Sequence, residues 1–217
     1  MSDRGMRVWT GLLLAALTTA TVGAGQLGSR PTEEWIKLLD APDRIAALRV
    51  DDVIAGLKLA PGQVVADLGA GTGAFALPLA KAVGPNGKVY AVEIDRGMVD
   101  YISAKAKKAG AANVLPLLGK ATDPSLPAAD VDLAFLHDVL HHVEDRPAFL
   151  KQAVRYLKPG ARFAVIELNP ATSPHRDDSR LVLDKAQVSA LMKDVGLVEA
   201  EDVRVSSDKW FVIYRRQ

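Results

Sequence analysis

The spacing of hydrophobic positions changes repeatedly along the chain after about residue 50. Short runs of β-branched and other apolar residues, typical of buried strands, alternate with longer stretches in which apolar residues recur every three or four positions, typical of helices. This alternation predicts βαβ units and therefore a mostly parallel sheet covered by helices. The expected strands are 64–68, 88–94, 114–118, 132–136 and 162–168, and the expected helices are 50–59, 74–83, 97–108, 146–157 and 185–195.

The last two apolar runs, 198–205 and 210–214, are separated by the four residues Ser206 to Lys209. A crossover between parallel strands needs a dozen or more residues, so these two strands must pair as an antiparallel hairpin. The predicted fold is therefore α/β: a doubly wound, Rossmann-like sheet of seven strands, mostly parallel with an antiparallel C-terminal edge hairpin, and with helices on both faces.

The first thirty residues follow another pattern. Arg4 and Arg7 precede an uncharged stretch, 8–27, in which an apolar run is followed by small residues, as in an export signal. An uncleaved membrane anchor is the alternative, because the stretch is nearly long enough to span a bilayer. We expect residues 1–30 to be a signal peptide or membrane anchor plus linker, 31–49 to be an N-terminal helical extension covering the active site, and 50–217 to be the main domain.

The amino-acid composition limits the size of the domain and the kinds of substrate and site that the chain can have. A chain of 217 residues, 49% apolar and 24% charged, can form one domain with a sizeable core and a modest extension. Its net charge of +1 provides no field to attract a polyanion, so a small-molecule substrate is expected and nucleic acid is not. The absence of cysteine excludes a disulfide framework, a thiolate nucleophile and a zinc–thiolate site.

A glycine-rich turn follows the first predicted strand, in the sequence Asp67-Leu68-Gly69-Ala70-Gly71-Thr72-Gly73. Glycine allows a tight turn and close approach of a ligand to the backbone, and the following helix presents free amide groups. The pattern also satisfies the dinucleotide fingerprint, with Glu93 about twenty residues further on. Asp67 favours the other interpretation, because a carboxylate there would repel a pyrophosphate and attract a cationic ligand.

At these residues the chain resembles the class I S-adenosylmethionine-dependent methyltransferases, within the ubiquinone/menaquinone methyltransferase-like group. The stretches that carry the resemblance are 65–73, 89–95, 132–142 and 156–160. It implies S-adenosyl-L-methionine as cofactor, with Asp67 near the methionine moiety and Glu93 accepting from the ribose hydroxyls. The other cofactor-binding residues that it implies are Gly69, Ala70, Gly71, Gly73, Ile94, Met98, Ala121, Thr122 and His137, with Asp95 near the adenine.

The chain departs from the family pattern after the third strand. Where the family commonly has Gly-Asp, this sequence has Gly119-Lys120. A lysine cannot accept a hydrogen bond from the adenine amino group. Adenine recognition is therefore expected to fall to the Ala121 backbone, to Thr122 or to Asp123.

The candidate catalytic residues follow the fourth strand: His137, Asp138, His141 and His142. In the resembled family this loop faces the transferred methyl group, and a histidine there could act as a general base. Structural packing of the paired histidines is the alternative. His137 and His141 share a helical face, but no third ligand stands out along the sequence, so we expect no metal site.

The sequence therefore predicts a methyltransferase that passes a methyl group to a small-molecule acceptor by in-line displacement. Two alternatives remain open, an NAD(P)-binding Rossmann oxidoreductase and a non-catalytic, cofactor-binding scaffold protein. The leader predicts an exported, periplasmic protein or a membrane-anchored one, associated through residues 8–27, with a cytoplasmic location as the alternative. The polar segment 169–180 and residues 35–39 are expected to roof the acceptor site.

Overall fold

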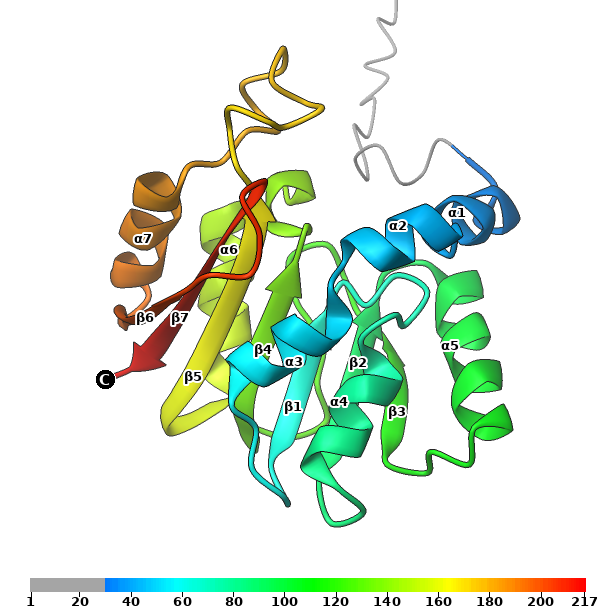
Figure 1. The fold of residues 1–217 in the computed structure, drawn as a ribbon. Helices are drawn as coiled ribbons and strands as arrows, with labels where there is room; N and C mark the ends of the chain where they lie inside the picture. Colours follow the sequence, from blue (N-terminus) through cyan, green and yellow to red (C-terminus); the bar gives the residue numbers. More distant parts are fainter. Residues whose placement is uncertain (1–29) are drawn as a thin grey trace, which may run out of the picture.

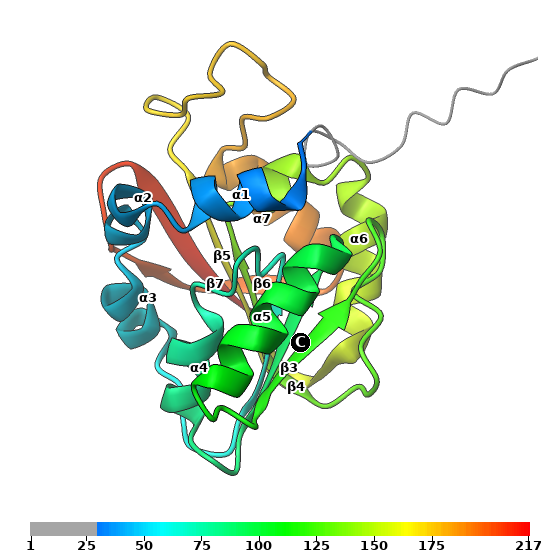
Figure 2. The same ribbon diagram turned by 90° about the vertical axis from the view of Figure 1, so that its right-hand side faces the viewer.

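The computed structural model describes residues 30–217, which form a single sheet with helices on both faces (Figures 1 and 2). The sheet has seven strands in the order β3-β2-β1-β4-β5-β7-β6. β1 to β5 are parallel, and β7 pairs antiparallel with both β5 and β6. The strands are β1 Val64–Leu68, β2 Lys88–Glu93, β3 Val114–Leu118, β4 Val131–His137, β5 Leu157–Leu168, β6 Leu197–Val203 and β7 Lys209–Arg216.

The helices belong to two layers and an N-terminal pair. They are α1 Thr32–Leu39, α2 Pro42–Ala47, α3 Val50–Leu57, α4 Ala76–Val83, α5 Arg96–Lys108, α6 Arg146–Ala153 and α7 Lys185–Asp194, with short 3₁₀ turns η2 Leu140–His142 and η3 Val154–Tyr156. One apolar cluster joins α3, α4 and α5 to the sheet, and a second cluster joins α6 and α7 to it. The predicted doubly wound fold with its antiparallel edge hairpin is confirmed.

The two apolar clusters follow from strand periodicity. Val65 and Val89 lie in the cluster of α3 to α5, while their chain neighbours Ala66 and Tyr90 lie in the cluster of α6 and α7. Successive side chains of a strand point to opposite faces, so a strand covered on both faces must be apolar throughout. This burial fixes the register of β1 and β2 and hence the positions of the residues at their carboxyl ends.

Several element boundaries differ from the sequence prediction. α4 begins at Ala76 instead of residue 74, because the glycine turn continues through Gly73. The helix predicted for 146–157 ends at Ala153, and β5 then begins at Leu157, which pairs with Val131 ahead of a register shift. α2 lies within the predicted helical extension 31–49 but was not predicted as a separate helix, although Pro42 at its start is a common first-turn residue.

Two segments lie at the end of the sheet where the parallel strands finish. Figure 1 shows α1 and α2 above that end on one side and the loop between β5 and α7 on the other. Within residues 30–217, no helix combines the length and apolarity needed to cross a bilayer. The predicted leader and its membrane-associated stretch, 8–27, lie outside the described residues.

Candidate functional site

The turn after β1 places backbone atoms at the carboxyl end of the sheet. Gly69, Gly71 and Gly73 have φ values of +80°, +56° and +72°, a region that side-chain-bearing residues rarely adopt. A Cβ added to Gly69 would lie 2.6 Å from the Val139 side chain. The amides of Gly69 and Ala70 both donate to the carbonyl of Val92 at 2.9 Å, which fixes the turn against β2. The turn therefore depends on glycine for both conformation and space.

Asp67, on β1 just before this turn, is buried with an unsatisfied carboxylate. Its side chain is 3% exposed, and its Oδ2 atom has no hydrogen-bond partner among the described residues. Burial, together with repulsion from Glu93, raises the pKa of Asp67 from 3.8 to about 7. An orphaned buried carboxylate costs stability unless a donor or a cation meets it. Asp67 is therefore suited to bind a cationic or hydrogen-bond-donating group.

Glu93 ends β2, the strand next to β1, and is also buried. Its Oε2 accepts from the Gly71 amide at 2.9 Å, and its Oε1 accepts from the Ile94 amide at 2.7 Å. Burial raises the pKa of Glu93, an effect that these backbone donors partly offset. Each carboxylate oxygen can accept a second hydrogen bond. Glu93 thus supports the glycine turn and keeps acceptor capacity for a ligand hydroxyl.

The start of α5 joins this region to the N-terminal extension. Asp95 caps α5 by accepting from the Met98 amide at 2.9 Å, and it also accepts from the Thr32 hydroxyl at 3.0 Å. Met98 is buried, whereas Ile94 is 41% exposed. Asp95 is therefore engaged in capping and in holding α1, a contact that the sequence did not indicate.

The loop after β3 forms a tight turn. The Lys120 amide donates to the Asp123 carbonyl at 2.8 Å, and Ala121 and Thr122 between them are exposed. The Asp123 carboxylate accepts from the Tyr156 hydroxyl at 2.9 Å and from the Ser125 amide at 2.7 Å. Asp123 is thus held within its own loop, which leaves Ala121 and Thr122 as the accessible part of this turn.

The N-terminal extension is fastened across the glycine turn. Leu39 lies 3.5 Å from the position that a Cβ on Gly71 would occupy. Asp40 accepts from the Tyr101 hydroxyl at 2.7 Å, and Lys105 donates to the Thr72 carbonyl at 2.9 Å. These contacts hold α1 against α5 and the turn.

His137 ends β4 beside the glycine turn, and Asp138 follows it. The His137 ring packs on Phe75 with centroids 4.9 Å apart, and burial lowers the pKa of His137 to about 4. Its Nε2 atom is buried with no hydrogen-bond partner among the described residues. Asp138 has a φ of +55° and forms an ion pair with Lys209 of β7. Burial works against its ionisation, yet His137 and Lys209 bring the pKa of Asp138 below its usual value.

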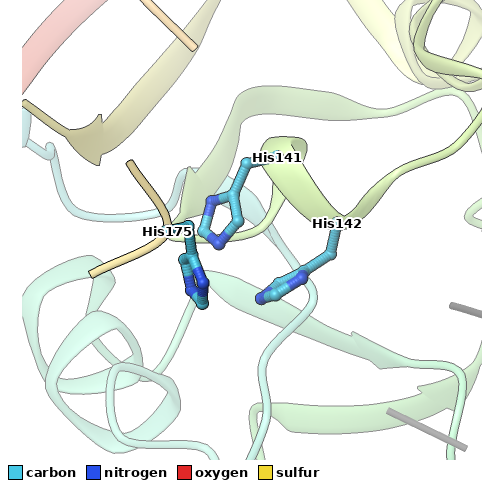
Figure 3. A group of neighbouring side chains, drawn as sticks. All are labelled: His141, His142 and His175. Carbon is cyan, nitrogen blue, oxygen red and sulfur yellow. The ribbon is translucent and has the colours of Figure 1, made fainter. Parts of the chain in front are cut away.

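His141 and His142 lie in η2, beside a glutamate and a third histidine. The Nδ1 atom of His141 is 2.6 Å from Oε2 of Glu167, and the His141 amide donates to Oε1 at 3.2 Å. Burial, with the adjacent His141 and His175, lowers the pKa of His142 to about 4. Figure 3 shows the rings of His141, His142 and His175 turned toward one another.

The structure therefore brings the sequence-predicted residues together in two groups. Asp67, Glu93 and the glycines form one group at the ends of β1 and β2, and the residues at and after the end of β4 form the other. Lys209 and His175 were missed as site residues, because each comes from a segment more than thirty residues further along the chain. Nothing in their local sequence signals the contact.

Comparison with known proteins adds an independent result. Residues 66–165 match the family model described as a methyltransferase domain. The chain is 35% identical over 132 residues to a 2-phytyl-1,4-naphtoquinone methyltransferase of Synechococcus elongatus, and 29% identical over 122 residues to a demethylmenaquinone methyltransferase of a Geobacillus species. These matches cover 60% and 56% of this chain but only 57% and 52% of the relatives, so the chain spans little more than half the length of each.

Solved structures give the same fold. A SAM-dependent methyltransferase from Aquifex aeolicus is 28% identical, with a TM-score of 0.76 over 87% of this chain and 100% of that one. A [4+2]-cyclase, SpnF, is 18% identical with a TM-score of 0.68 over 82% of this chain and 83% of that one, a likeness of fold alone. The fold therefore carries more than one chemistry, and the site residues must decide between them.

Proposed function

We propose that the protein is a class I S-adenosylmethionine-dependent methyltransferase and transfers a methyl group from S-adenosylmethionine to a quinone-type small molecule. The match of residues 66–165 to a methyltransferase domain and the likeness to named methyltransferases support this proposal. The observation that carries the proposal is the pair of buried acids, Asp67 and Glu93, on either side of a glycine turn. The acceptor class is taken from the two quinone-acting relatives.

The residues present fit the proposed cofactor. The orphaned Oδ2 atom of Asp67 would receive the cationic amino group of the methionine moiety, and Glu93 would accept from the ribose hydroxyls. Gly69, Ala70, Gly71 and Gly73 would supply a backbone surface free of side chains. The bound cofactor supplies a methyl group already activated by the positive charge on sulfur.

The adenine end of the cofactor would lie between the start of α5 and the turn after β3. Ile94, which is exposed, and Met98, which is buried, would provide apolar contact there. Ala121 and Thr122 are the accessible residues of the facing turn, and Thr122 can exchange hydrogen bonds with the base edge. The Thr32–Asp95 hydrogen bond would position α1 over this end of the site, as a cover for it.

On the acceptor side, the protein has to hold the acceptor in line with the sulfur–methyl bond and exclude water. His137 and Asp138 lie at the end of β4 and would contact the cofactor or the acceptor. The proton of a hydroxyl or ring-carbon acceptor would leave toward the His141 and His142 rings, where Glu167 orients His141 through its Nδ1 atom.

Asp67 also disfavours the nicotinamide-dependent alternative. A dinucleotide would place its pyrophosphate on the glycine turn, beside a buried carboxylate that has no neutralising partner among the described residues. A non-catalytic scaffold protein would keep the cofactor contacts but transfer no methyl group.

Calorimetry with S-adenosylhomocysteine tests the proposal. Wild-type full-length protein should bind it, and Glu93→Ala should weaken binding by ~10–100-fold, since a hydrogen bond to a charged group contributes about 1.5–3 kcal/mol. Glu199→Ala, on the exposed edge strand β6, is the matched control and should bind as the wild type does. Tighter binding of NAD or NADP than of S-adenosylhomocysteine would contradict the proposed methyltransferase function.

A labelled-methyl assay then tests the acceptor. Transfer to hydroquinones in a lipid extract is expected, and cofactor binding without transfer to any extract would favour the scaffold alternative. Export or anchoring through residues 8–27 also remains part of the proposal. Cell fractionation combined with protease accessibility checks it, and a freely soluble cytoplasmic pool alone would contradict it.

A further inference from the structure

Three of the four histidines in the chain form one cluster. One ring nitrogen from each of His141, His142 and His175 lies within 4.8 Å of the other two. The ring centroids are 4.0 Å apart for His141 and His142, 5.5 Å for His141 and His175, and 6.0 Å for His142 and His175. Figure 3 shows that His175 reaches the other two from a separate segment of chain.

The surroundings of the cluster orient one of the rings. Glu167, which is 1% exposed, lies 2.6 Å from Nδ1 of His141 and also accepts from the His141 amide. A carboxylate that holds Nδ1 leaves Nε2 of the same ring to act as a ligand, and metal-binding histidines are usually held by such a partner. If His141 served only to fill space in the core, a buried carboxylate that contacts both its ring and its amide would not be needed.

We propose that His141, His142 and His175 bind one divalent transition-metal ion of the Zn²⁺ type, with Glu167 as the positioning residue. Three imidazoles suit Zn²⁺, Co²⁺, Ni²⁺ or Cu²⁺, whereas Mg²⁺ and Ca²⁺ prefer oxygen ligands. A tetrahedral ion with bonds of ~2.0–2.1 Å needs its ligand nitrogens ~3.3 Å apart. Modest ring rotations from the present arrangement would close that distance.

The proposed ion has two consequences. It would tie the loop between β5 and α7, which carries His175, to the η2 turn that follows β4. Three protein ligands also leave a fourth position open, which water would fill. If the proposed function holds, a hydroxyl of the acceptor could take that position instead and lose its proton more readily, to water, because the ligating histidines would then no longer act as the base. The binding of the ion does not depend on methyl transfer.

Cobalt titration of the full chain, purified without a histidine tag and stripped with a chelator, tests the site. One equivalent of Co²⁺ should bind and give the intense visible absorption of a tetrahedral nitrogen-ligated ion, and Zn²⁺ should displace it while excess Mg²⁺ should not. Glu167→Gln should weaken binding by ~10–100-fold, and His175→Ala should weaken it further.

Two control variants test whether a change in Co²⁺ binding comes from the histidine cluster itself. Arg176→Ala changes an exposed neighbour of His175, and His137→Gln removes the one histidine outside the cluster, so both should keep the wild-type Co²⁺ spectrum. Circular dichroism of each variant checks that it is folded. The proposal is overturned if no stoichiometric Co²⁺ binds, or if His175→Ala binds as tightly as the wild type. Failure of S-adenosylhomocysteine to bind would count against the proposed function and leave this test unaffected.

Discussion

The two halves of the candidate site are built in different ways. In the half formed by β1 and β2, Asp67 and Glu93 lie on adjacent paired strands, and Glu93 accepts hydrogen bonds from backbone amides. In the half formed by β4 and β5, His137, Asp138 and His141 are completed by side chains from distant segments, Lys209 and His175. The first half is thus fixed by the sheet itself, whereas the second depends on how a loop and an edge strand pack. Four substitutions can break or sharpen this comparison.

The largest effect is expected from Asp67→Asn, which removes the unpaired charge of the β1–β2 half. The folded-state pKa of Asp67, about 7, is above its ordinary value of 3.8, so the native state holds an extra proton between pH 4 and 7. Ionisation therefore costs stability as pH rises through that window, by up to ~4 kcal/mol. The free energy of unfolding of Asp67→Asn should exceed that of the wild type increasingly from pH 4 to pH 8, in urea titrations.

Asp51→Asn is the control for Asp67→Asn, because it removes a carboxylate that is exposed on α3 instead of one that is buried. The same Asp67→Asn protein should bind S-adenosylhomocysteine more weakly than the wild type. A difference between Asp67→Asn and wild type that stays constant from pH 4 to 8 would refute the account of Asp67.

Gly69→Ala should come next in size. The added Cβ would lie 2.6 Å from Val139 in a backbone conformation with φ of +80°, so overpacking and backbone strain together should cost about 3 kcal/mol. Gly62→Ala has a similar φ of +85° but no atom within 4 Å of the new Cβ, and should cost only about 1 kcal/mol. Urea unfolding measures both, and equal losses would show that close packing at Gly69 is unimportant.

Lys209→Met tests the β4–β5 half. It leaves Asp138 largely buried without its cation, and because the pair retains some solvent contact we expect a loss of about 2 kcal/mol. Adding Asp138→Asn to Lys209→Met should restore part of that loss, since no buried charge then remains. Thermal and urea unfolding of the single and double variants check this, and a double variant no more stable than the single one would argue against the ion pair.

The smallest effect is expected from Thr32→Val, which removes the hydrogen bond between α1 and Asp95. One side-chain hydrogen bond contributes about 1 kcal/mol, and the loss should be confined to the N-terminal extension. Amide hydrogen exchange should become faster in α1 and stay unchanged in β1 and β4. Unchanged exchange in α1 would mean that Leu39 and Asp40 alone hold the extension.

Much of the fold could be predicted because its causes are local. The apolar run at Val64–Leu68 and the glycine positions after it specify a strand and a turn whatever the remainder of the chain does. The short link between β6 and β7 leaves only antiparallel pairing. The boundary of β5 was missed because Leu157 becomes part of a strand only by pairing with Val131, a contact across twenty-six residues.

For the site, the sequence by itself determined the acids and glycines at the ends of β1 and β2, since each lies at the end of an apolar run that predicts its own strand. Only the tertiary structure decided that Leu39 covers Gly71, that Lys209 neutralises Asp138 and that His175 joins His141 and His142. These contacts join segments that are far apart along the chain, and no repeating pattern of residues in the sequence marks which of them will meet. Their formation depends on packing of the whole domain, which no local pattern of residues encodes.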